Sequence, residues 1–340
     1  MDIVYVLEST VLAGGVKNVF EQADRLADLG YRTQLFALGG QPEWFPLRTM
    51  IRQFPNYSIM SNELKEMDAI KVATWWKTAQ VVWNCCDPKQ GGCGIPFYLV
   101  QDIEESYYTH WPAMGDQVRQ TYNIPMPILT IAEWTTNQLL EHYRRDAIPI
   151  SIAIDQEVFK PCRSDGYDPY RIVACSRKSQ PLKGYDITVQ AVKAVYRELP
   201  QIAFDTYGLE DPGIYGIPGH HLFRPDDRTI AQLYSNCGVF VQTSYHEGFG
   251  LPILEAMACG TPVVVTRAEG NEEFCHHEKN CVMVEKGDVE GVAQGIVRVL
   301  TDREFAASIS AQGRETARTY DWAKVLHRLD HIFGPYAGKR

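Results

Sequence analysis

The chain has 340 residues, a length that suits two domains of ordinary size better than one. Its net charge of −9 excludes nucleic acid as the expected partner, because a phosphate backbone needs a basic face. No apolar run approaches the roughly 18–20 residues of a membrane-spanning helix, and the first residues, MDIVYVLEST, lack the basic start of a signal peptide. The nine cysteines are odd in number and scattered, which predicts a reducing, cytoplasmic setting with at most peripheral membrane contact.

Short apolar runs alternate with amphipathic helical patterns along most of the chain. The apolar spacing after the first run predicts a helix that ends at Gly30, since glycine commonly follows the last helical residue. Runs that are apolar on both faces and alternate with helices are typical of parallel sheets covered on both sides. Strands are expected at 3–7, 33–37, 80–83, 96–100, 128–132, 172–175, 203–207, 238–242 and 262–266.

The alternation is interrupted by the stretch IDQEVFKPCRSDGYDPYR, whose proline, glycine and polar residues read as a linker. We therefore expect a first domain over 1–158 and a second over 159–318. The amphipathic segment within 319–340 is expected to pack back on the first domain as a separate helix. The predicted fold class is α/β, with two Rossmann-like parallel-sheet domains that face an interdomain cleft, where such sheets bind ligands at their strand carboxyl ends.

The stretch SYHEGFGLPILEAMACGTPVVVT places two glutamates around a glycine loop. Gly248 and Gly250 let the backbone approach a ligand, and a helix that starts near Leu251 directs unpaired N–H groups and its positive dipole end toward phosphate. A carboxylate can accept hydrogen bonds from sugar hydroxyls. Glu247 is therefore interpreted as a contact to a transferred sugar and Glu255 as a contact to a ribose. The alternative is a helix with acidic residues near its start, which is common and favourable.

Basic residues follow the strand expected at 172–175, in the stretch SRKSQPLKGYD. Arg177 and Lys183 could stabilise a departing pyrophosphate, Arg as a fork of donors and Lys as a point charge. Lys178 competes for either role. The alternative is a solvated basic loop.

Two loops of the first domain are further candidates. Gly14 and Gly15 in STVLAGGVKN could admit a phosphate or sugar, although the pattern is not the G-x-G-x-x-G of nicotinamide-cofactor proteins. In YLVQDIEESYY, the strand-end residues Gln101, Asp102 and Glu104 could bind an acceptor hydroxyl or the donor sugar. Each loop could also be an ordinary turn, with Asp102 as a helix cap.

Two cysteine- and histidine-rich stretches raise the question of a metal. CCDPKQGGCG and CHHEKNC contain no C-x-x-C pair, and adjacent ligands rarely reach one tetrahedral ion together. We therefore expect no metal site.

Taken together, these segments resemble the retaining GT-B glycosyltransferases of family 4, also described as glycosyl transferases group 1. The resemblance lies in EGFGLPILEAMACGTPVVVT, with its E-x7-E pattern, in ACSRKSQPLKGYDITVQAV, and in TRAEGNEEF and NCVMVEKGDVEGVAQGIVRVL, and it covers nearly all of the second domain. In the first domain, AGGVKNVFEQADRLADLGY fits the family's glycine-loop helix, and YLVQDIEESYY is similar to a segment of rhamnosyltransferases that build surface glycans.

The resemblance implies an enzyme that transfers a hexose-type unit from a nucleotide-diphosphate sugar to a glycan, lipid-linked or other hydroxyl acceptor, in glycan synthesis. It implies retention of the anomeric configuration, no cofactor and no metal. Arg177 and Lys183 would hold the diphosphate, Glu247 the sugar and Glu255 the ribose. The donor contacts would include the Gly248–Phe249–Gly250–Leu251 loop. The base would lie near Phe223 and Arg224, and the latter stands where the family commonly has glycine.

Three other functions stay open. A nucleotide-sugar epimerase of the same architecture would isomerise the donor without an acceptor, and a non-catalytic nucleotide-sugar-binding subunit would bind the donor without transfer. A nicotinamide-linked oxidoreductase is disfavoured by the incomplete glycine pattern. The sequence does not name the sugar, the base, the acceptor or the oligomeric state.

Overall fold

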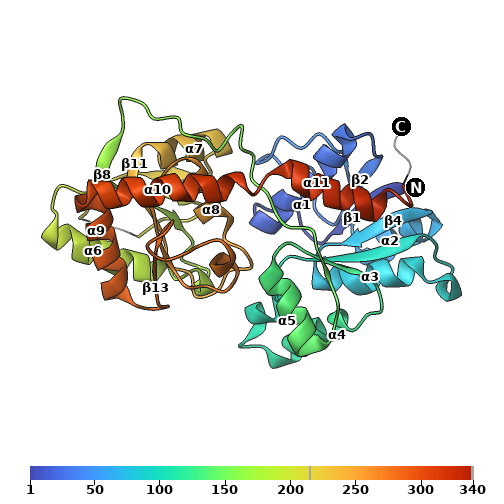
Figure 1. The fold of residues 1–340 in the computed structure, drawn as a ribbon. Coiled ribbons are helices and arrows are strands. Elements are labelled where there is room, and N and C mark those ends of the chain that lie inside the picture. The colour runs from blue at the N-terminus through green and yellow to red at the C-terminus, as the bar shows by residue number, and fades with distance from the viewer. Residues whose placement is uncertain (214–215, 338–340) are drawn as a thin grey trace. The chain divides into compact units, whose positions relative to one another are not determined.

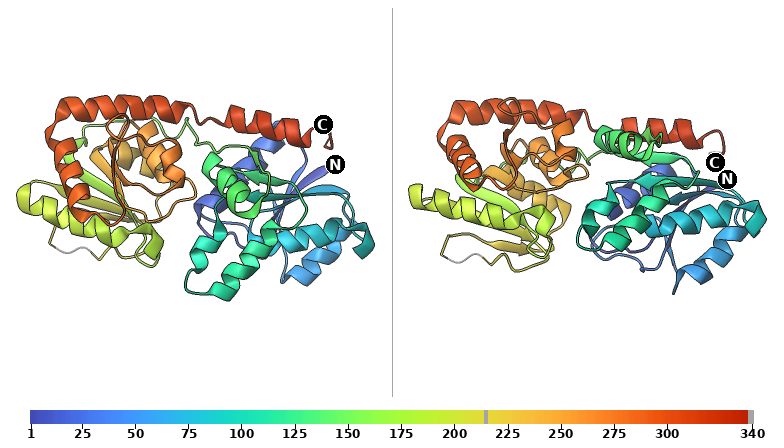
Figure 2. Two further views of the ribbon diagram at one scale, coloured as in Figure 1. Left: turned by 60° about the horizontal axis from the view of Figure 1, so that its bottom comes forward. Right: turned by 90° about the horizontal axis from the view of Figure 1, so that it is seen from below.

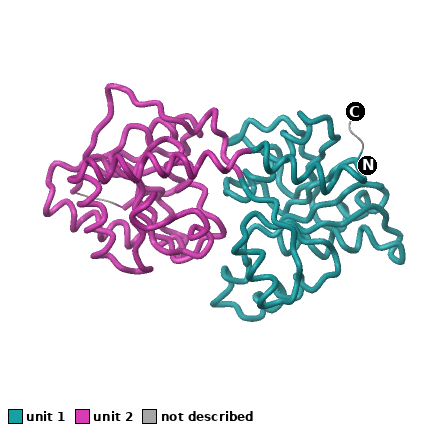
Figure 3. Tube along the Cα trace, in the orientation of Figure 1, with its two compact units in different colours: residues 1–152, 322–340 teal, residues 153–321 magenta. Residues whose placement is uncertain are grey.

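The computed structural model describes residues 1–213 and 216–337 and divides into two compact units. The first unit comprises Met1–Ile152 together with the segment from Trp322 onward, and the second comprises Ala153–Asp321 (Figure 3). The sequence predicts domain divisions after residues 158 and 318, whereas the two units divide after residues 152 and 321. Residues 154–167, where the linker was expected, form no helix or strand.

The first unit is built on a seven-stranded parallel sheet with the strand order β3-β2-β1-β4-β5-β6-β7. Figure 1 labels three of these strands, β1, β2 and β4. The chain therefore leaves β1 in one direction and later returns to its other side at β4. At such a reversal the flanking loops diverge and leave a crevice at the strand carboxyl ends. The strands are β1 (Asp2–Leu7), β2 (Thr33–Ala37), β3 (Ile51–Gln53), β4 (Ala69–Ala73), β5 (Ile95–Val100), β6 (Ile128–Thr130) and β7 (Ile148–Pro149).

Helices lie on both faces of this sheet (Figure 2). The first helix, α1, buries its apolar face at Val19, Phe20, Ala23 and Leu26, as the sequence predicts, and Gly30 follows it with φ +94°. The helical segments are α1 (Gly14–Asp28), α2 (Tyr57–Glu66), α3 (Trp76–Cys86), α4 (Pro112–Tyr122), α5 (Glu133–Tyr143) and α11 (Trp322–Phe333), with short 3-10 turns at η1 (Pro88–Gln90) and η2 (Glu104–Tyr108).

The C-terminal helix α11 packs on the first unit beside α1 (Figure 1). The Phe333 ring lies 5.3 Å from the Phe97 ring, and the Arg25 guanidinium lies 5.0 Å from the Trp322 ring centroid. This return of the chain is part of the predicted fold and is confirmed.

The second unit contains a six-stranded parallel sheet with the order β10-β9-β8-β11-β12-β13, which reverses in the same way between β8 and β11. Helices α6 and α9 pack against each other, while α8 packs against α7 and α10. The two parallel sheets confirm the predicted α/β class. The elements are β8 (Asp168–Ser176), η3 (Pro181–Lys183), α6 (Tyr185–Glu198), β9 (Ala203–Gly208), β10 (His221–Phe223), α7 (Asp227–Ser235), β11 (Cys237–Gln242), α8 (Leu251–Ala258), β12 (Val263–Thr266), η4 (Gly270–Glu273), β13 (Val282–Val284), α9 (Val289–Thr301) and α10 (Arg303–Arg318).

One predicted strand is wrong. Residues 80–83 lie inside helix α3, where Val82 is fully buried. A short apolar run has no period long enough to distinguish a strand from the covered face of a helix. The strand actually present in this region is β4, whose centre carries Lys71.

Lys71 explains why β4 was missed, because a lysine interrupts the apolar pattern of a buried strand. The side chain is nevertheless fully buried. Its Nζ donates hydrogen bonds to the backbone carbonyls of Cys85, at 2.9 Å, and of Cys93, at 2.7 Å. Four other strands were missed, and each is only two or three residues long: β3, β7, β10 and β13.

Across the described ranges, 1–213 and 216–337, no helix has both the length and the apolar composition needed to cross a membrane. In the same residues, no three His, Cys, Asp or Glu side chains are grouped so that they could hold a metal ion.

Candidate functional site

The glycine loop and the helix after it form at the carboxyl end of β11. Gly250 caps α8 with φ +101°, a conformation that side chains rarely adopt, and Pro252 occupies the first turn. Phe249 is almost fully buried, and its ring stacks 5.0 Å from that of Phe274. The Phe249 side chain therefore anchors the loop.

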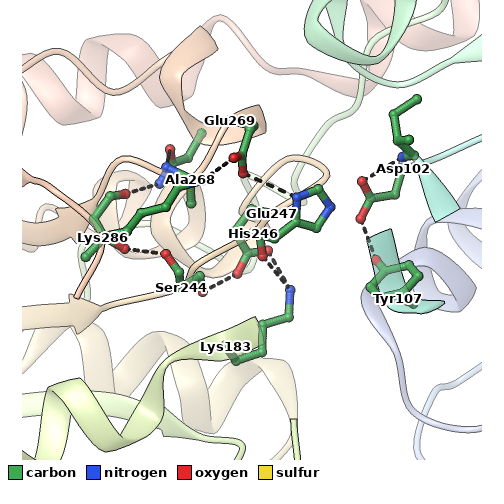
Figure 4. A network of polar contacts seen from close by, with 12 residues as sticks. Asp102, Tyr107, Lys183, Ser244, His246, Glu247, Ala268, Glu269 and Lys286 are labelled. Atoms are coloured by element: carbon green, nitrogen blue, oxygen red, sulfur yellow. Dashed lines mark hydrogen bonds and ion pairs between the residues drawn. The ribbon is translucent and has the colours of Figure 1, made fainter. Parts of the chain in front are cut away.

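Glu247 is a buried carboxylate with three donors around it. Its Oε1 accepts a hydrogen bond from Ser244 Oγ at 2.6 Å, and its Oε2 accepts one from Lys183 Nζ at 2.9 Å (Figure 4). Gln242 Nε2 also donates to Oε1, at 2.8 Å. Burial alone would raise the pKa of Glu247, but Lys183, the Ser244 hydroxyl and Arg177 together bring it below its ordinary value. The carboxylate is therefore held ionised although only 7% of the residue is exposed to solvent.

A glycine allows Lys183 to reach Glu247. Gly184 has φ +57°, and a Cβ at this position would lie 1.9 Å from the carbonyl oxygen of Thr243. Only glycine lets the start of α6 come this close to the loop after β11. The backbone N–H of Tyr245 fastens the two loops by donating to the Leu182 carbonyl at 2.8 Å.

Arg177, Lys183 and Glu247 line one cavity in the second unit. The cavity lies at the carboxyl ends of β8 and β11, where the strand order reverses. Cys175 and, after it, Glu247 raise the pKa of Arg177 against the opposing effect of burial, so the guanidinium stays charged. The structure thus brings together the three residues that the sequence nominates for catalysis.

Other lining residues were not singled out from the sequence: Cys175, Tyr185, Thr188, Gln242, Thr243 and Ser244. Most have the composition of ordinary strand ends and helix starts. Only the position of Gln242, directly before the loop that contains Glu247, could have drawn attention to it.

Glu255 lies in α8 and is 8% exposed. It does not line the cavity of Arg177 and Glu247. The pKa of Tyr207 is raised by its burial, by Cys175 and then by Glu255. The Tyr207 hydroxyl lies 2.5 Å from the hydroxyl of Tyr234. The carboxylate therefore sits beside a pair of buried phenols.

Phe223 and Arg224 lie at the end of the edge strand β10, away from the cavity lining. The Phe223 ring is 61% exposed, and the Arg224 guanidinium carbon lies 5.2 Å from the ring centroid. Arg224 has φ +49°, and its N–H donates to the Gly208 carbonyl at 3.1 Å. An exposed aromatic ring with a neighbouring cation offers a stacking surface.

A second polar network supports the glycine loop and was missed by sequence reasoning. His246 Nδ1 lies 3.3 Å from Glu269 Oε2, and Lys286 pairs with the same carboxylate (Figure 4). Burial opposes ionisation of Glu269, but His246 and Lys286 bring its pKa below the ordinary value. Gly270 follows, and a Cβ there would lie 2.2 Å from the Gly248 carbonyl oxygen, so this loop packs tightly on the one that carries Glu247.

In the first unit, the glycine loop after β1 is braced by Gln101. Gln101 follows β5, donates from Nε2 to the Gly15 carbonyl at 3.1 Å, and accepts from Asn18 Nδ2 at 2.9 Å. Gly14 begins helix α1. These residues lie at the carboxyl ends of strands on either side of the reversal between β1 and β4.

The two acidic residues of the segment after β5 differ in their surroundings. Asp102 is 6% exposed and accepts hydrogen bonds from the Ile103 N–H, at 2.7 Å, and the Tyr107 hydroxyl, at 2.5 Å. Glu104 is 2% exposed, and the Oε2 atom of its carboxyl group accepts from the Trp76 N–H at 2.8 Å and the Tyr98 hydroxyl at 3.1 Å. Burial raises the pKa of Glu104 well above its usual range. This position suits a structural role for Glu104 better than a contact to sugar.

Comparison with known proteins agrees with this architecture. The family model described as glycosyl transferases group 1 matches residues 166–316. The D-inositol 3-phosphate glycosyltransferase of Salinispora tropica is 30% identical over 184 residues, which are 48% of this chain and 38% of that protein. The chain spans less than two thirds of the curated relatives it matches, with 38%, 42% and 58% of the length of three of them.

Solved structures share the whole described fold. Anabaena HepE in complex with UDP-glucose has a TM-score of 0.85 at 18% identity, and the match covers 98% of this chain and 100% of that one. WaaG, a glycosyltransferase involved in lipopolysaccharide biosynthesis, has a TM-score of 0.76 at 14% identity with the same coverage of 98% and 100%. The likeness confirms the predicted GT-B fold class.

Proposed function

We propose that this protein is a glycosyltransferase that moves a sugar from a nucleotide-diphosphate sugar to a glycan, lipid-linked or other hydroxyl acceptor. The observation that carries the proposal is the cavity in which Arg177 and Lys183 face the ionised carboxylate of Glu247. Two cations beside a carboxylate suit a ligand whose diphosphate is negative and whose sugar presents hydroxyl donors. The match of residues 166–316 to glycosyl transferases group 1 supports the same function.

In this proposal the diphosphate binds between Arg177 and Lys183, with the positive end of the α8 dipole directed at phosphate. Glu247 accepts hydrogen bonds from the sugar and orients its anomeric carbon. The bond between that carbon and the diphosphate oxygen breaks, and the acceptor oxygen bonds to the same carbon. The departing phosphate takes the acceptor's proton on the same face, so the configuration is retained.

The cations act where negative charge develops on the leaving group, which is the step that preorganised charge accelerates most. Arg177 and Lys183 can supply this charge, and the proposal therefore includes no metal and no cofactor. It follows the family 4 pattern of retaining enzymes.

The other nominated residues have proposed roles at the edges of this site. Glu255 would hold the ribose, the backbone from Gly248 to Leu251 the phosphates, and Phe223 with Arg224 the base. Gly14 and Gly15 would admit the donor, while Gln101 and Asp102 would serve the acceptor side. Glu104 would hold the segment after β5 in place and so support the acceptor side indirectly. We place the enzyme in the cytoplasm, in glycan synthesis, with at most peripheral membrane contact and with no nucleic-acid partner.

The proposal is tested by a donor screen followed by a transfer assay. Thermal shifts are measured with UDP-, GDP-, dTDP- and ADP-sugars, because a ligand at ~100 times its Kd adds about 2.7 kcal/mol of stability. Transfer with the best donor is then followed with and without EDTA, and the anomeric configuration of the product is read by NMR. Isomerised donor without acceptor would identify an epimerase, and binding without hydrolysis or transfer would identify a non-catalytic subunit.

Substitutions of Arg177 and Lys183 test whether these two cations act in the transfer reaction. Arg177→Ala and Lys183→Ala are each expected to lower the transfer rate by about 10²–10³, as loss of one preorganised donor does elsewhere. Lys178→Ala is the matched control, because Lys178 is exposed and does not line the cavity. Near-wild-type turnover in either cavity variant would remove that residue from the site.

A further inference from the structure

Two buried polar atoms of the cavity-lining residues have no hydrogen-bond partner among residues 1–213 and 216–337. They are Oε1 of Gln242 and the hydroxyl oxygen of Tyr185. A buried polar atom without a partner costs on the order of 1–3 kcal/mol, so folded proteins seldom keep one. Both residues line the cavity that Arg177, Lys183 and Glu247 also line, so a ligand bound in this cavity is the candidate partner for the two atoms.

The orientation of the Gln242 amide follows from chemistry. One end of the amide lies 2.8 Å from Glu247 Oε1, and an ionised carboxylate only accepts hydrogen bonds. The end that faces Glu247 must therefore be the NH₂ group, since the carbonyl end would set two acceptors against each other. The unpartnered end of Gln242 is consequently the carbonyl oxygen, which requires a donor.

Tyr185 presents the complementary group. It follows Gly184 at the start of α6, its ring belongs to the hydrophobic core of the second unit, and only 4% of the residue is exposed. Burial is the largest cause of its raised pKa, so the phenol stays protonated and can donate. The hydroxyl can also accept a hydrogen bond.

The two atoms together select among ligand groups. An ionised phosphate oxygen could accept from Tyr185 but could not donate to Gln242. A hydroxyl group does both. The diphosphate of the proposed donor would occupy Arg177 and Lys183, which leaves the hydroxyls of its sugar as the groups of this kind nearest to Glu247.

We propose that Gln242 and Tyr185 form a subsite that binds a hydroxyl group of the transferred sugar and so contributes to sugar specificity. The inference rests on the proposed function. Gln242 has a second task, because its NH₂ group, with Ser244, fixes the carboxylate of Glu247 in place.

The subsite is tested by calorimetric binding of UDP, GDP, dTDP and ADP and of their glucose esters to the full chain. The quantity of interest is the ratio of the Kd of each nucleoside diphosphate to the Kd of its glucose ester. For the base that binds best, Tyr185→Phe is expected to lower this ratio about fivefold, the effect of one hydrogen bond, while the Kd of the nucleoside diphosphate changes less than twofold. The melting temperature of the free variant should stay unchanged or rise, because the hydroxyl has no partner to lose among the described residues.

Two further variants separate the subsite from general packing. Tyr196→Phe removes a hydroxyl from the same helix about three turns away and should leave the ratio unchanged. Gln242→Leu and Ser244→Ala both remove a donor to Glu247, but only Gln242→Leu also removes the unpartnered carbonyl oxygen. Gln242→Leu should therefore lower the ratio more than Ser244→Ala does.

An unchanged ratio in Tyr185→Phe would mean that bound water alone serves these atoms and would overturn the subsite. Equal losses for nucleoside diphosphate and glucose ester, or a wild-type ratio near one for every base, would overturn it as well. Failure of the wild-type protein to bind any of the eight compounds would instead refute the proposed function. The two failures are thereby distinguished.

Discussion

The ammonium group of Lys183 lies 2.9 Å from Oε2 of Glu247, although the two residues are 64 positions apart in the chain. Both side chains are largely buried, with 16% and 9% of their surfaces exposed. In the proposed reaction Lys183 also binds diphosphate, so the ion pair and the ligand compete for the same cation. This competition makes the roles of the two residues separable by experiment.

Glu247→Gln should separate binding from transfer. Loss of the carboxylate charge releases Lys183 for phosphate, and the affinity for the nucleoside diphosphate should rise about fivefold, which corresponds to ~1 kcal/mol for an ion pair that no longer competes. Transfer should fall by about 10² or more, because the sugar loses its anchor. Calorimetry and a transfer assay measure the two effects. Weaker nucleotide binding together with normal transfer would contradict both roles.

The ionised state of Glu247 predicts a pH dependence of stability. Because its folded-state pKa lies below the unfolded value of about 4.3, the charged side chain stabilises the folded protein above that pH. The contribution is lost as the pH falls through the lower folded-state pKa. Urea unfolding of the wild type and of Glu247→Gln between pH 7 and pH 3 should therefore show a difference in free energy that shrinks toward acid pH. A difference that grows there would show that the carboxyl is buried in its neutral form.

Gly184→Ala should displace Lys183. The substitution places an alanine in the left-handed backbone conformation that Gly184 already has. It also adds a Cβ 1.9 Å from the Thr243 carbonyl oxygen. Gly91→Ala is a matched control, because Gly91 has φ +75° and no atom of the described residues lies within 4 Å of the added Cβ. The control should lose about 1–3 kcal/mol from strain alone. Gly184→Ala should lose more and should also lose donor binding. Equal losses of stability in the two variants would mean that the close approach of the loops is unimportant.

Glu104→Gln should be tolerated at neutral pH. Burial raises the pKa of Glu104, so its ionisation costs stability as the pH rises above the unfolded value of about 4.3. Gln keeps an oxygen for the Trp76 N–H and the Tyr98 hydroxyl but removes the charge. At pH 7 the free energy of unfolding should equal or exceed that of the wild type, and the advantage should shrink as the pH falls toward 4. Glu105→Gln, at a more exposed position, is the control, and a marked loss in Glu104→Gln alone would show that the charge is required.

Much of the fold could be predicted because it depends on local patterns. The alternation of apolar runs with helical periods indicates parallel sheets, and the glycine that follows a helix is readable by itself, as Gly30 shows. The pattern failed at Lys71, since its burial depends on two carbonyls, those of Cys85 and Cys93, that other segments supply. It failed again at 80–83, where packing rather than sequence decided that the apolar run belongs to a helix.

The candidate site divides in the same way. Arg177, Lys183 and Glu247 could be nominated from the sequence because charged residues and glycines at strand ends are informative wherever the sheet is parallel. Gln242 and Tyr185 could not, since a glutamine at a strand end and a tyrosine at a helix start are ordinary residues. Their meaning depends on whether a partner lies within hydrogen-bond distance, and in the described structure the Gln242 carbonyl and the Tyr185 hydroxyl have none.

By itself the sequence determined the two α/β units, the glycine loop before α8 and the charged residues at the ends of β8 and β11, because periodicity and turn chemistry are local properties. Only the tertiary structure decided that Gly184 brings Lys183 against Glu247, that Glu104 turns into the first unit, and that Gln242 and Tyr185 border one cavity. These are distances between segments far apart in the chain, and such distances are set by packing.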